Sequence, residues 1–430
     1  MKRTVLLGAG LALAAAMPCW SPPARAQSSG VNPDISAIGM FIACPQGEED
    51  CAYGEADGWI NLQEVELALQ GYLNPYVRGD LFAAYHDGEF EFEEAYASFL
   101  RGLGPFQARV GKYRVDWGSI NPLHPHAYSW IFQPLVEERF FGEEGLNQIA
   151  ANLNVSFPVG ERGELKLSAN ALRGDIGPGL HDHGQEEGED AGKRTYCVGP
   201  GCEDGICEPG DADCAIVYYE APGVELGSGD PEIAWHVRGS YFNQFKPSHS
   251  ILVGVDALGG TIEPEIDRKV LWYGADFKYR WRPDKYRSLN VIGSYMRNEI
   301  DAEEDRVTTA TCVGPGCVAG VCPEGAVCRD FETVEPVLEG TLATDGWYVL
   351  ADWQFAERWN GGLKYDQSQG LDSTDAIRRA EAFLNFRIME ESTVFRLLVR
   401  REDGDLYESA ETTSALQFVF SLGPHRPHSF

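Results

Sequence analysis

Apolar and polar residues alternate along many segments of the chain, as lipid-facing and lumen-facing positions do in a transmembrane β-barrel. The clearest segment is 269–281, in which leucine, alanine and aromatic residues occupy one face and glycine and charged residues the other. Segments 232–245, 377–388 and 414–422 show the same two-residue period. Aromatic residues recur near the segment ends, where a barrel places its interface girdles. The pattern therefore predicts an all-β fold, a transmembrane antiparallel up-and-down β-barrel.

About sixteen such segments follow one another along the chain. Their predicted first residues are Asp34, Trp59, Tyr76, Phe90, Phe106, Asn147, Glu164, Glu232, Ile251, Lys269, Ser288, Asp345, Asn360, Ile377, Val394 and Thr412. The even-numbered connections are all short turns, and the long connections, 44–58, 118–146, 174–231 and 299–344, are all odd-numbered. Alternate connections share one side of the membrane in such a barrel, so we expect the long ones to be extracellular loops.

Residues 1–26 have the order of a secretory signal peptide, with Lys2 and Arg3, then an apolar run, then small residues before Gln27. The rest of the chain contains no run of apolar residues long enough for a membrane-spanning helix, so only a closed barrel could cross a bilayer. No Pro/Ser-rich linker divides it. We expect residues 27–430 to form one outer-membrane β-barrel domain.

The formal net charge of −31 disfavours nucleic acid as a partner. Outer-membrane lipid is the partner that the predicted barrel implies. The acidic residues concentrate in short clusters, 48–50, 186–190 and 301–305, which lie between the alternating segments. These clusters are typical of solvated loops, and they could also attract cations.

Apart from Cys19, every cysteine lies in a long connection. These residues are Cys44, Cys51, Cys197, Cys202, Cys207, Cys214, Cys312, Cys317, Cys322 and Cys328. The clusters in 174–231 and 299–344 share the motif CVGPGC. A secreted chain with an even number of cysteines favours disulfides that restrain the loops. A thiolate metal site is the alternative, and the pairing within each cluster stays open.

The connection 118–146 is too apolar for a free surface loop. Its large hydrophobic residues are Trp130, Ile131, Phe132, Leu135, Phe140 and Phe141. Burial against the inner wall of a wide barrel would satisfy them, and it would narrow the channel. We therefore expect an inward-folded constriction loop. Its candidate constriction residues are Asn121, His124, His126, Trp130, Glu143 and Glu144.

Histidines in two of the long connections are candidate metal ligands. His124 and His126 share a loop with several glutamates, and His181 and His183 precede the acidic cluster 186–190. Imidazole with carboxylate suits zinc, nickel or copper. The alternatives are that Pro125 holds the first pair in hydrogen bonds to the loop backbone and that the second pair lies in a solvated segment. The fold requires no cofactor, and Zn²⁺ or another divalent cation is considered as a solute.

Charged residues recur at positions predicted to face the lumen. The arginines are Arg78, Arg109, Arg238, Arg280, Arg379, Arg387, Arg396 and Arg400. A ladder of arginines would draw anions inward, whereas acidic loops would collect cations at the entrance. In a third interpretation, many of these charges pair with acids across the lumen wall. The sequence leaves the three interpretations open.

Several segments resemble a family of proteobacterial outer-membrane porin-like proteins, often described as zinc-regulated and TonB-dependent-receptor-like. The resemblance is carried by EFEEAYASF at 91–99, by GKYRVDWGSINPLHPHAYSWIFQPL at 111–135 and by FSLGPHRPHSF at 420–430. The HPH segment is its most specific part. The resemblance implies a fold like that of the wide trimeric porins, including phosphate-selective ones. Because the first expected strand follows closely on the cleavage site, we expect no plug domain.

The leading functional hypothesis is passive diffusion of small solutes, including metal ions such as zinc or small metal complexes, through a homotrimeric porin. The alternative is a surface binding or scaffold protein whose disulfide-stapled loops engage a partner. No Ser-His-Asp set or pair of acids has a spacing that stands out, so we do not expect an enzyme.

Overall fold

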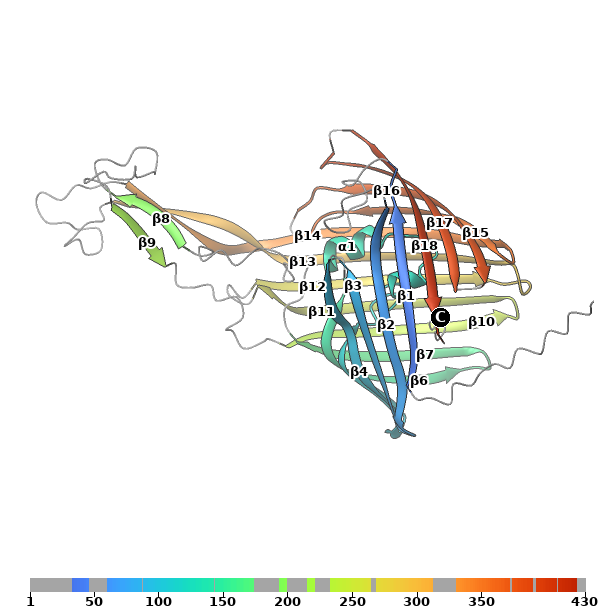
Figure 1. Ribbon diagram of the computed structural model, residues 1–430. Helices are drawn as coiled ribbons and strands as arrows, with labels where there is room; N and C mark the ends of the chain where they lie inside the picture. Colours follow the sequence, from blue (N-terminus) through green and yellow to red (C-terminus); the bar gives the residue numbers. More distant parts are fainter. Residues whose placement is uncertain are drawn as a thin grey trace, which may run out of the picture.

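The computed structural model of the chain consists mainly of β-strands (Figure 1). It describes residues 33–45, 60–86, 88–142, 144–173, 193–198, 215–220, 233–263, 268–311, 330–371, 373–389, 392–407 and 409–423. The predictions of a signal peptide at 1–26 and of roles for Glu143, His181 and His183 lie outside the described residues.

Sixteen strands pair side by side into one closed antiparallel barrel. Their order follows the sequence, and β1 pairs with β18 to close the ring, with Phe41 opposite Phe418. The predicted transmembrane antiparallel fold is therefore confirmed. The barrel strands are β1 (Asp34–Ala43), β2 (Ile60–Asn74), β3 (Val77–His86), β4 (Glu89–Leu103), β5 (Phe106–Arg114), β6 (Asn147–Val159), β7 (Gly163–Arg173), β10 (Ile233–Lys246), β11 (His249–Glu263), β12 (Arg268–Trp281), β13 (Ser288–Thr311), β14 (Asp330–Ala356), β15 (Trp359–Ser368), β16 (Ile377–Met389), β17 (Thr393–Gly404) and β18 (Glu411–Leu422).

One predicted strand start is wrong. The sequence predicts a strand at Asp345 after a loop at 299–344, but β14 already begins at Asp330 and β13 continues to Thr311. The two strands pair up to Thr311 opposite Asp330, and this ribbon projects beyond the barrel (Figure 1). Two strands satisfy each other's backbone groups without an apolar face, so the alternation used to locate strands is absent there. Every other predicted start lies within two residues of the observed one.

The connection 174–231 also contains strands. β8 (Lys193–Val198) and β9 (Ala215–Glu220) form a separate two-stranded antiparallel sheet. The sequence predicts this region only as a long loop, because neither six-residue segment shows an alternation strong enough to identify a strand. Cys197 lies in β8, opposite Ile216 of β9.

The outer surface of the barrel is apolar and aromatic. On β12, Leu271, Tyr273 and Phe277 are exposed, whereas Val270 and Trp272 point inward and are buried. A closed ladder leaves no backbone N–H or C=O group at a free edge, so this surface can face hydrocarbon. The barrel lies in the outer membrane, as predicted. Further exposed apolar residues are Leu165, Leu167, Val253, Val255, Trp347, Val349, Leu397 and Val399.

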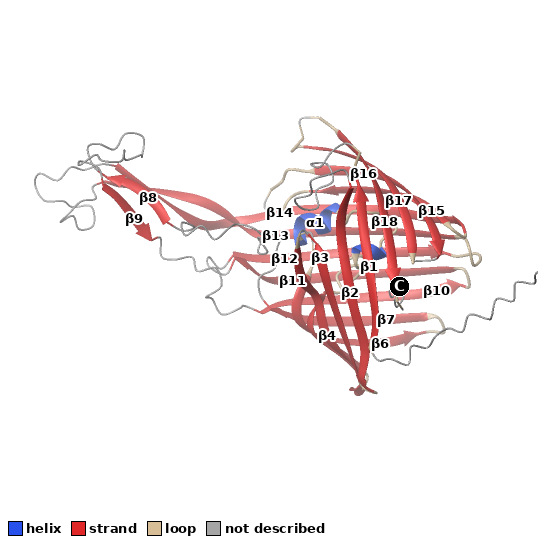
Figure 2. Ribbon diagram, in the orientation of Figure 1, coloured by secondary structure: helices blue, strands red, loops and turns tan. Residues whose placement is uncertain are grey.

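The connection between β5 and β6, residues 115–146, folds into the barrel. It contains a short 3₁₀ helix (Pro125–Ala127) and α1 (Leu135–Phe141), and Figure 2 shows α1 within the ring of strands. The helices of the described residues include none that is long and apolar enough to cross a membrane.

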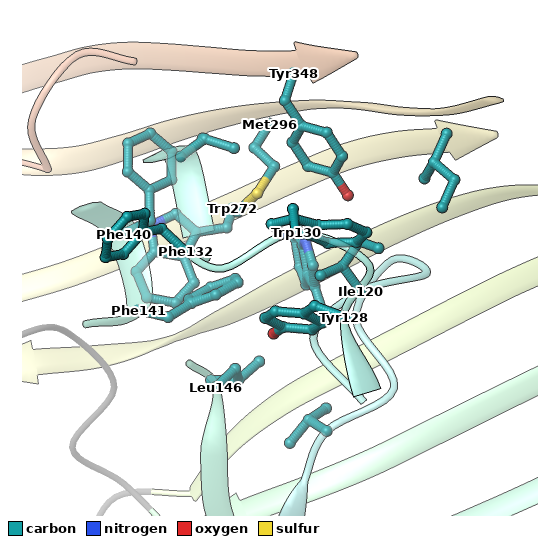
Figure 3. Packing of buried hydrophobic residues seen from close by; sticks show 14 of the residues in the cluster. Ile120, Tyr128, Trp130, Phe132, Phe140, Phe141, Leu146, Trp272, Met296 and Tyr348 are labelled. Atoms are coloured by element: carbon teal, nitrogen blue, oxygen red, sulfur yellow. The ribbon is translucent and has the colours of Figure 1, made fainter. Parts of the chain in front are cut away.

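The hydrophobic core lies in the lumen, between this inward loop and the wall (Figure 3). The Phe141 ring contacts Trp272 of β12 at a centroid distance of 5.1 Å, and Trp130 stacks on Tyr128 at 4.8 Å. Met296 of β13 lies in the same cluster. Each such side chain contributes about 1.5–3 kcal/mol when removed from water. All six large hydrophobic residues of the loop are buried.

Candidate functional site

Asn121 holds the two ends of the inward loop together. Its amide nitrogen donates to the carbonyl oxygens of Val115 at 2.7 Å and Leu146 at 3.1 Å, and its side-chain oxygen accepts from the Leu146 N–H at 2.8 Å. The neighbouring Gly145 has φ +66°, and a Cβ there would lie 2.6 Å from the Asn121 oxygen. These contacts hold Val115 and Leu146, the two ends of the loop, close together.

Four consecutive strands of the wall, β14 to β17, bind the loop. Asp352 of β14 accepts from Ser129 Oγ at 2.9 Å, and Lys364 of β15 donates to a loop carbonyl at 3.0 Å. Asn385 of β16 and Arg396 of β17 each donate to a loop carbonyl at 2.6 Å. Hydrogen bonds to charged groups contribute about 1.5–3 kcal/mol each. This part of the wall therefore anchors the loop.

α1 places a buried carboxyl group in the lumen. Glu137 is buried, and its Oε1 accepts from the Tyr348 hydroxyl at 3.4 Å. Burial raises the pKa of Glu137 to about 8, and repulsion from Asp276 and Asp366 adds to the increase. At neutral pH this carboxyl group is mostly protonated in the folded protein.

The two histidines of the HPH segment meet carboxylates of the wall. The His124 Nδ1 atom lies 2.9 Å from Oε2 of Glu66 and 3.2 Å from Oε2 of Glu93, and its Nε2 lies 3.6 Å from Oε1 of Glu94. The His126 Nδ1 lies 3.4 Å from the same Glu66 oxygen. All five side chains are buried. We call this set the histidine–carboxylate cluster. Strands β2 and β4 supply its acids.

Two register shifts in the sheet turn these acidic side chains toward the lumen. The register of β2 against β1 shifts next to Gln63, so that Gln63 and Glu64 are both buried and Glu66 follows on the inner face. The register of β3 against β4 shifts next to Glu93, and Glu93 and Glu94 are both buried. A β-bulge reorients side chains in this way, and bulges are common next to functional sites.

The histidine–carboxylate cluster changes the protonation of His124. Burial alone would lower the pKa of His124, but attraction to Glu66 and hydrogen bonds to Glu66, Glu93 and Glu94 raise it well above 6.5. The carboxylates thus favour the protonated form of His124 over the neutral one.

A polar cavity of about 470 Å³ lies between the loop and strands β5, β6, β7, β10, β11 and β12. Four cationic and two acidic side chains line it: Arg109, Lys166, Arg238, Lys278, Asp116 and Glu164. Asparagine, serine, aromatic and apolar side chains also line it, together with residues 118, 119, 122 and 123 of the loop.

Nearby acids neutralise the cations of this cavity to different degrees. Arg238 pairs with Asp256 and lies 2.7 Å from an Asp276 oxygen. Lys166 Nζ is 3.8 Å from Asp116, and the Arg109 guanidinium stacks over the Tyr96 and Tyr113 rings. Among the described residues, nearby acids thus neutralise Arg109 and Lys166 only weakly.

The remaining predicted lumen arginines lie at inward positions of their strands. Arg78 pairs with Asp80, Arg379 bonds Glu138 of α1 at 2.8 Å, and Arg400 lies 3.0 Å from Glu402. Arg396 also donates to Gln417 at 2.6 Å, while Arg280 and Arg387 are partly buried. Most of these side chains are held by protein groups and do not reach the cavity.

The other predicted residues have structural contacts. Trp130 belongs to the core, and the Glu144 carbonyl accepts from Arg114 at 2.8 Å. Cys44 is buried at the end of β1. The other predicted cysteines, Cys197 in β8 excepted, lie outside the described residues, and the disulfide interpretation stays a prediction.

Sequence reasoning missed the acids that face the histidines. Glu66 and Glu93 belong to segments identified as strands, but neither was predicted as a site residue. The available signal was a break in the alternation: the polar pairs Gln63-Glu64 and Glu93-Glu94 interrupt the two-residue period. Such a doublet indicates a bulge that turns two neighbouring polar side chains to the same face.

Comparison with known proteins gives one relative in sequence and several likenesses in fold. No protein-family model matches the chain. A protein of Aquifex aeolicus (strain VF5), described as an uncharacterized protein, is 35% identical over 399 residues, which cover 89% of this chain and 72% of the relative. OmpT of Vibrio cholerae in its trimer form aligns over 91% of this chain and 99% of its own, with 8% identity and a TM-score of 0.49. An anion-selective porin from Comamonas acidovorans aligns over 91% and 98%, with 8% identity and a TM-score of 0.46.

The closed ring of sixteen strands, the apolar outer surface and the inward loop define an outer-membrane β-barrel of porin architecture. Within this class, the chain belongs to the same family as the Aquifex aeolicus protein. The more specific resemblance to zinc-regulated proteins stays a prediction. The structural likenesses have TM-scores below 0.5 and carry no inference about solute or assembly.

Proposed function

We propose that this protein is an outer-membrane channel through which small hydrophilic solutes diffuse passively. The observation that carries the proposal is the polar cavity of about 470 Å³ between the inward loop and the wall. The buried apolar residues of the loop pack among themselves and against the wall, and the cavity is the open space that they leave. Barrels of this size narrow their lumen with inserted segments and use the remaining opening for passage.

The charges of the cavity favour small anions over cations. Four cationic side chains line it against two acidic ones, and Arg109 and Lys166 are only weakly neutralised. A lining of one predominant sign raises the local concentration of the opposite ion. The sequence-based alternative, in which the solutes are zinc ions or small metal complexes, stays a prediction, and this lining gives it no support.

Conductance across planar lipid bilayers tests the channel. We expect the reconstituted protein to give stable ohmic steps and Ser240→Trp, which fills the cavity from β10, to reduce the step severalfold. Ala151→Trp is the matched control, because Ala151 is exposed on the lipid-facing side of β6. Wild-type protein that folds and inserts without conducting would contradict the proposal, as would equal conductance in Ser240→Trp and Ala151→Trp.

Assembly into a homotrimer remains a prediction. Chemical cross-linking of the protein in intact outer membranes, followed by gel electrophoresis, tests it. A gel that shows only the monomer would contradict it.

A further inference from the structure

We propose that the histidine–carboxylate cluster is a binding site for one divalent cation of the zinc type, with Glu66, His124 and His126 as ligands. The site joins the inward loop to β2 and is separate from the cavity on β5 to β12. It concerns the binding of a resident ion, so it does not depend on the proposed channel function.

The three ligand atoms already converge. One carboxylate oxygen and two imidazole nitrogens lie within 4.8 Å of one another, and the His124 and His126 Nδ1 atoms lie 2.9 Å and 3.4 Å from the same Glu66 oxygen. Zinc binds nitrogen and oxygen at about 2.0–2.2 Å, which places two ligands of a tetrahedral ion roughly 3.2–3.6 Å apart. Only small side-chain adjustments separate the observed arrangement from a coordination sphere.

The chain geometry explains why these two nitrogens face the same way. His124 precedes and His126 lies within the short 3₁₀ helix that begins at Pro125, and the two rings stack at a centroid distance of 5.5 Å with 26° between their planes. The proline ring fixes one backbone angle between them. The carbonyl of His126 accepts from Arg396, which holds the segment against the wall.

Charge balance in the cluster favours a bound cation. Glu64 is buried beside the three carboxylates of the cluster, and Glu64 Oε1 and Glu66 Oε1 have no hydrogen-bond partner within the described part of the chain. Arg114 reaches Glu93 only at 3.9 Å. Buried carboxylates without sufficient compensation are costly, and a divalent cation would supply two positive charges at the point where they converge.

The ligand types select the class of metal. Two imidazoles with a carboxylate suit zinc and its neighbours, whereas magnesium and calcium prefer oxygen ligands alone. Glu93, 3.2 Å from His124 Nδ1, is within reach of a fourth position, which a water molecule could also fill. Outer carboxylates of this kind orient histidine ligands and strengthen their binding.

A second group of possible ligands lies next to the proposed site. His86, Glu91 and Glu144 also place ligand atoms within 4.8 Å of one another, and all three are partly exposed. Arg114 links the two groups, because it lies 3.9 Å from Glu93 and 3.5 Å from Glu144.

Metal binding to the full-length protein in detergent tests the site. After chelator treatment and dialysis against Zn²⁺, we expect wild-type protein to hold one more zinc ion per chain than Glu66→Gln or His126→Ala. We expect zinc affinity at this site to fall at least tenfold in each variant. Glu137→Gln is the matched control, since it also removes a buried carboxyl group at the inward loop but lies outside the cluster. The difference between variants matters because cysteines and histidines elsewhere could also bind zinc.

Cobalt provides a readout that does not require a variant to fold. Co²⁺ added to wild-type protein should give the intense visible absorption of a four-coordinate site, and an equimolar amount of Zn²⁺ should abolish it. Equal zinc content in wild-type, Glu66→Gln and His126→Ala proteins would overturn the proposal, as would a weak six-coordinate cobalt spectrum. A wild-type protein that binds no zinc while Glu66→Gln loses thermal stability would instead assign the cluster as a metal-free ion pair.

Discussion

The two sides of the barrel wall use inward-facing charges in different ways. On β14 to β17, the charged and polar side chains bind the inward loop, as Lys364 and Arg396 do. On β5 to β12, Asp256 and Asp276 also accept hydrogen bonds from the start of the loop, but side chains such as Arg109 and Lys166 line a cavity. Both sides have the same alternation of apolar and polar residues. Whether a lumen charge anchors the loop or lines open space is decided by which part of the loop lies opposite.

The loop itself produces this asymmetry. Its helix α1 packs against β14 and β15, and the ring of Phe141 packs against Trp272 of β12, where the wall offers buried surface. Charges enclosed with them must be fully paired, because little water is left to solvate them. The segment 118–123, at the start of the loop, faces the cavity.

The largest expected effect on stability comes from removing Lys364, the central cation of strands β14 to β17. These strands are the anchoring side of the wall, because they bind the inward loop. Lys364 is buried, and its Nζ lies 3.3 Å from Asp366 and 3.0 Å from Glu381. Lys364→Met would leave two buried carboxylates without this partner, and we expect the free energy of unfolding to fall by about 3–5 kcal/mol. Urea unfolding monitored by tryptophan fluorescence measures it. Lys246→Met, at an exposed position near a turn, should change it by less than about 0.5 kcal/mol. Equal losses in the two variants would show that the anchoring side is not held by these charges.

The next effect concerns the base of the loop. Asn121→Ala removes the hydrogen bonds to Val115 and Leu146, and we expect a loss of about 2 kcal/mol together with greater and noisier conductance. Asn154→Ala is the matched change on the cavity side, where the amide donates only to Asn152 at 2.9 Å within the described residues. We expect that variant to lose less than about 1 kcal/mol. Single-channel recordings and urea unfolding of both variants give the comparison, and a quiet wild-type-like channel in Asn121→Ala would contradict it.

The sequence predicted the barrel well because membrane strands obey a local rule. Each strand must turn one face to lipid and the other to the lumen, so the strand from Lys269 onward is identifiable from its own residues. The same rule failed for the start of β14 at Asp330, because that ribbon lies beyond the barrel and needs no lipid-facing side. The pairing of β14 with β13 decides where this strand begins, and local alternation does not record that pairing.

The candidate sites were predictable only in part. The apolar content of the inward loop required burial, which placed His124 and His126 inside the barrel. Their partner Glu66 could not be identified, because the register of β2 and the path of a loop about sixty residues later along the chain jointly decide that contact. Likewise, the sequence did not indicate which arginines line the cavity, because all of them occupy inward positions of the same apolar–polar alternation.

Stability on the anchoring side should also depend on pH. The pKa of Glu137 is about 8 in the folded protein and near 4.5 when unfolded, so the folded state holds one more proton between these values. The contribution of this group is fully present below about pH 4.5 and is lost as the pH rises to about 8. Comparison of wild-type protein and Glu137→Gln in the presence of chelator should show a difference in unfolding free energy that changes by about 1.4 kcal/mol per pH unit across this range. Glu161→Gln, at an exposed turn, should follow the wild type. A constant difference between wild type and Glu137→Gln would mean that this carboxyl group stays ionised.

The smallest expected effect lies on the cavity side and concerns selectivity. Lys166 lines the cavity, and its Nζ is 3.8 Å from Asp116, so it contributes a charge that is only partly neutralised. Lys166→Gln should lower the permeability ratio of chloride to potassium by about twofold and leave stability unchanged, because a solvated ion pair at that distance contributes little.

Reversal potentials in a salt gradient measure the ratio, and Lys246→Gln, which removes the same charge outside the cavity, should not alter it. Screening by added salt should reduce the difference between the two variants, since the effect is electrostatic. An unchanged ratio in Lys166→Gln would place the ion path elsewhere in the lumen and would remove the main support for assigning passage to this side of the barrel.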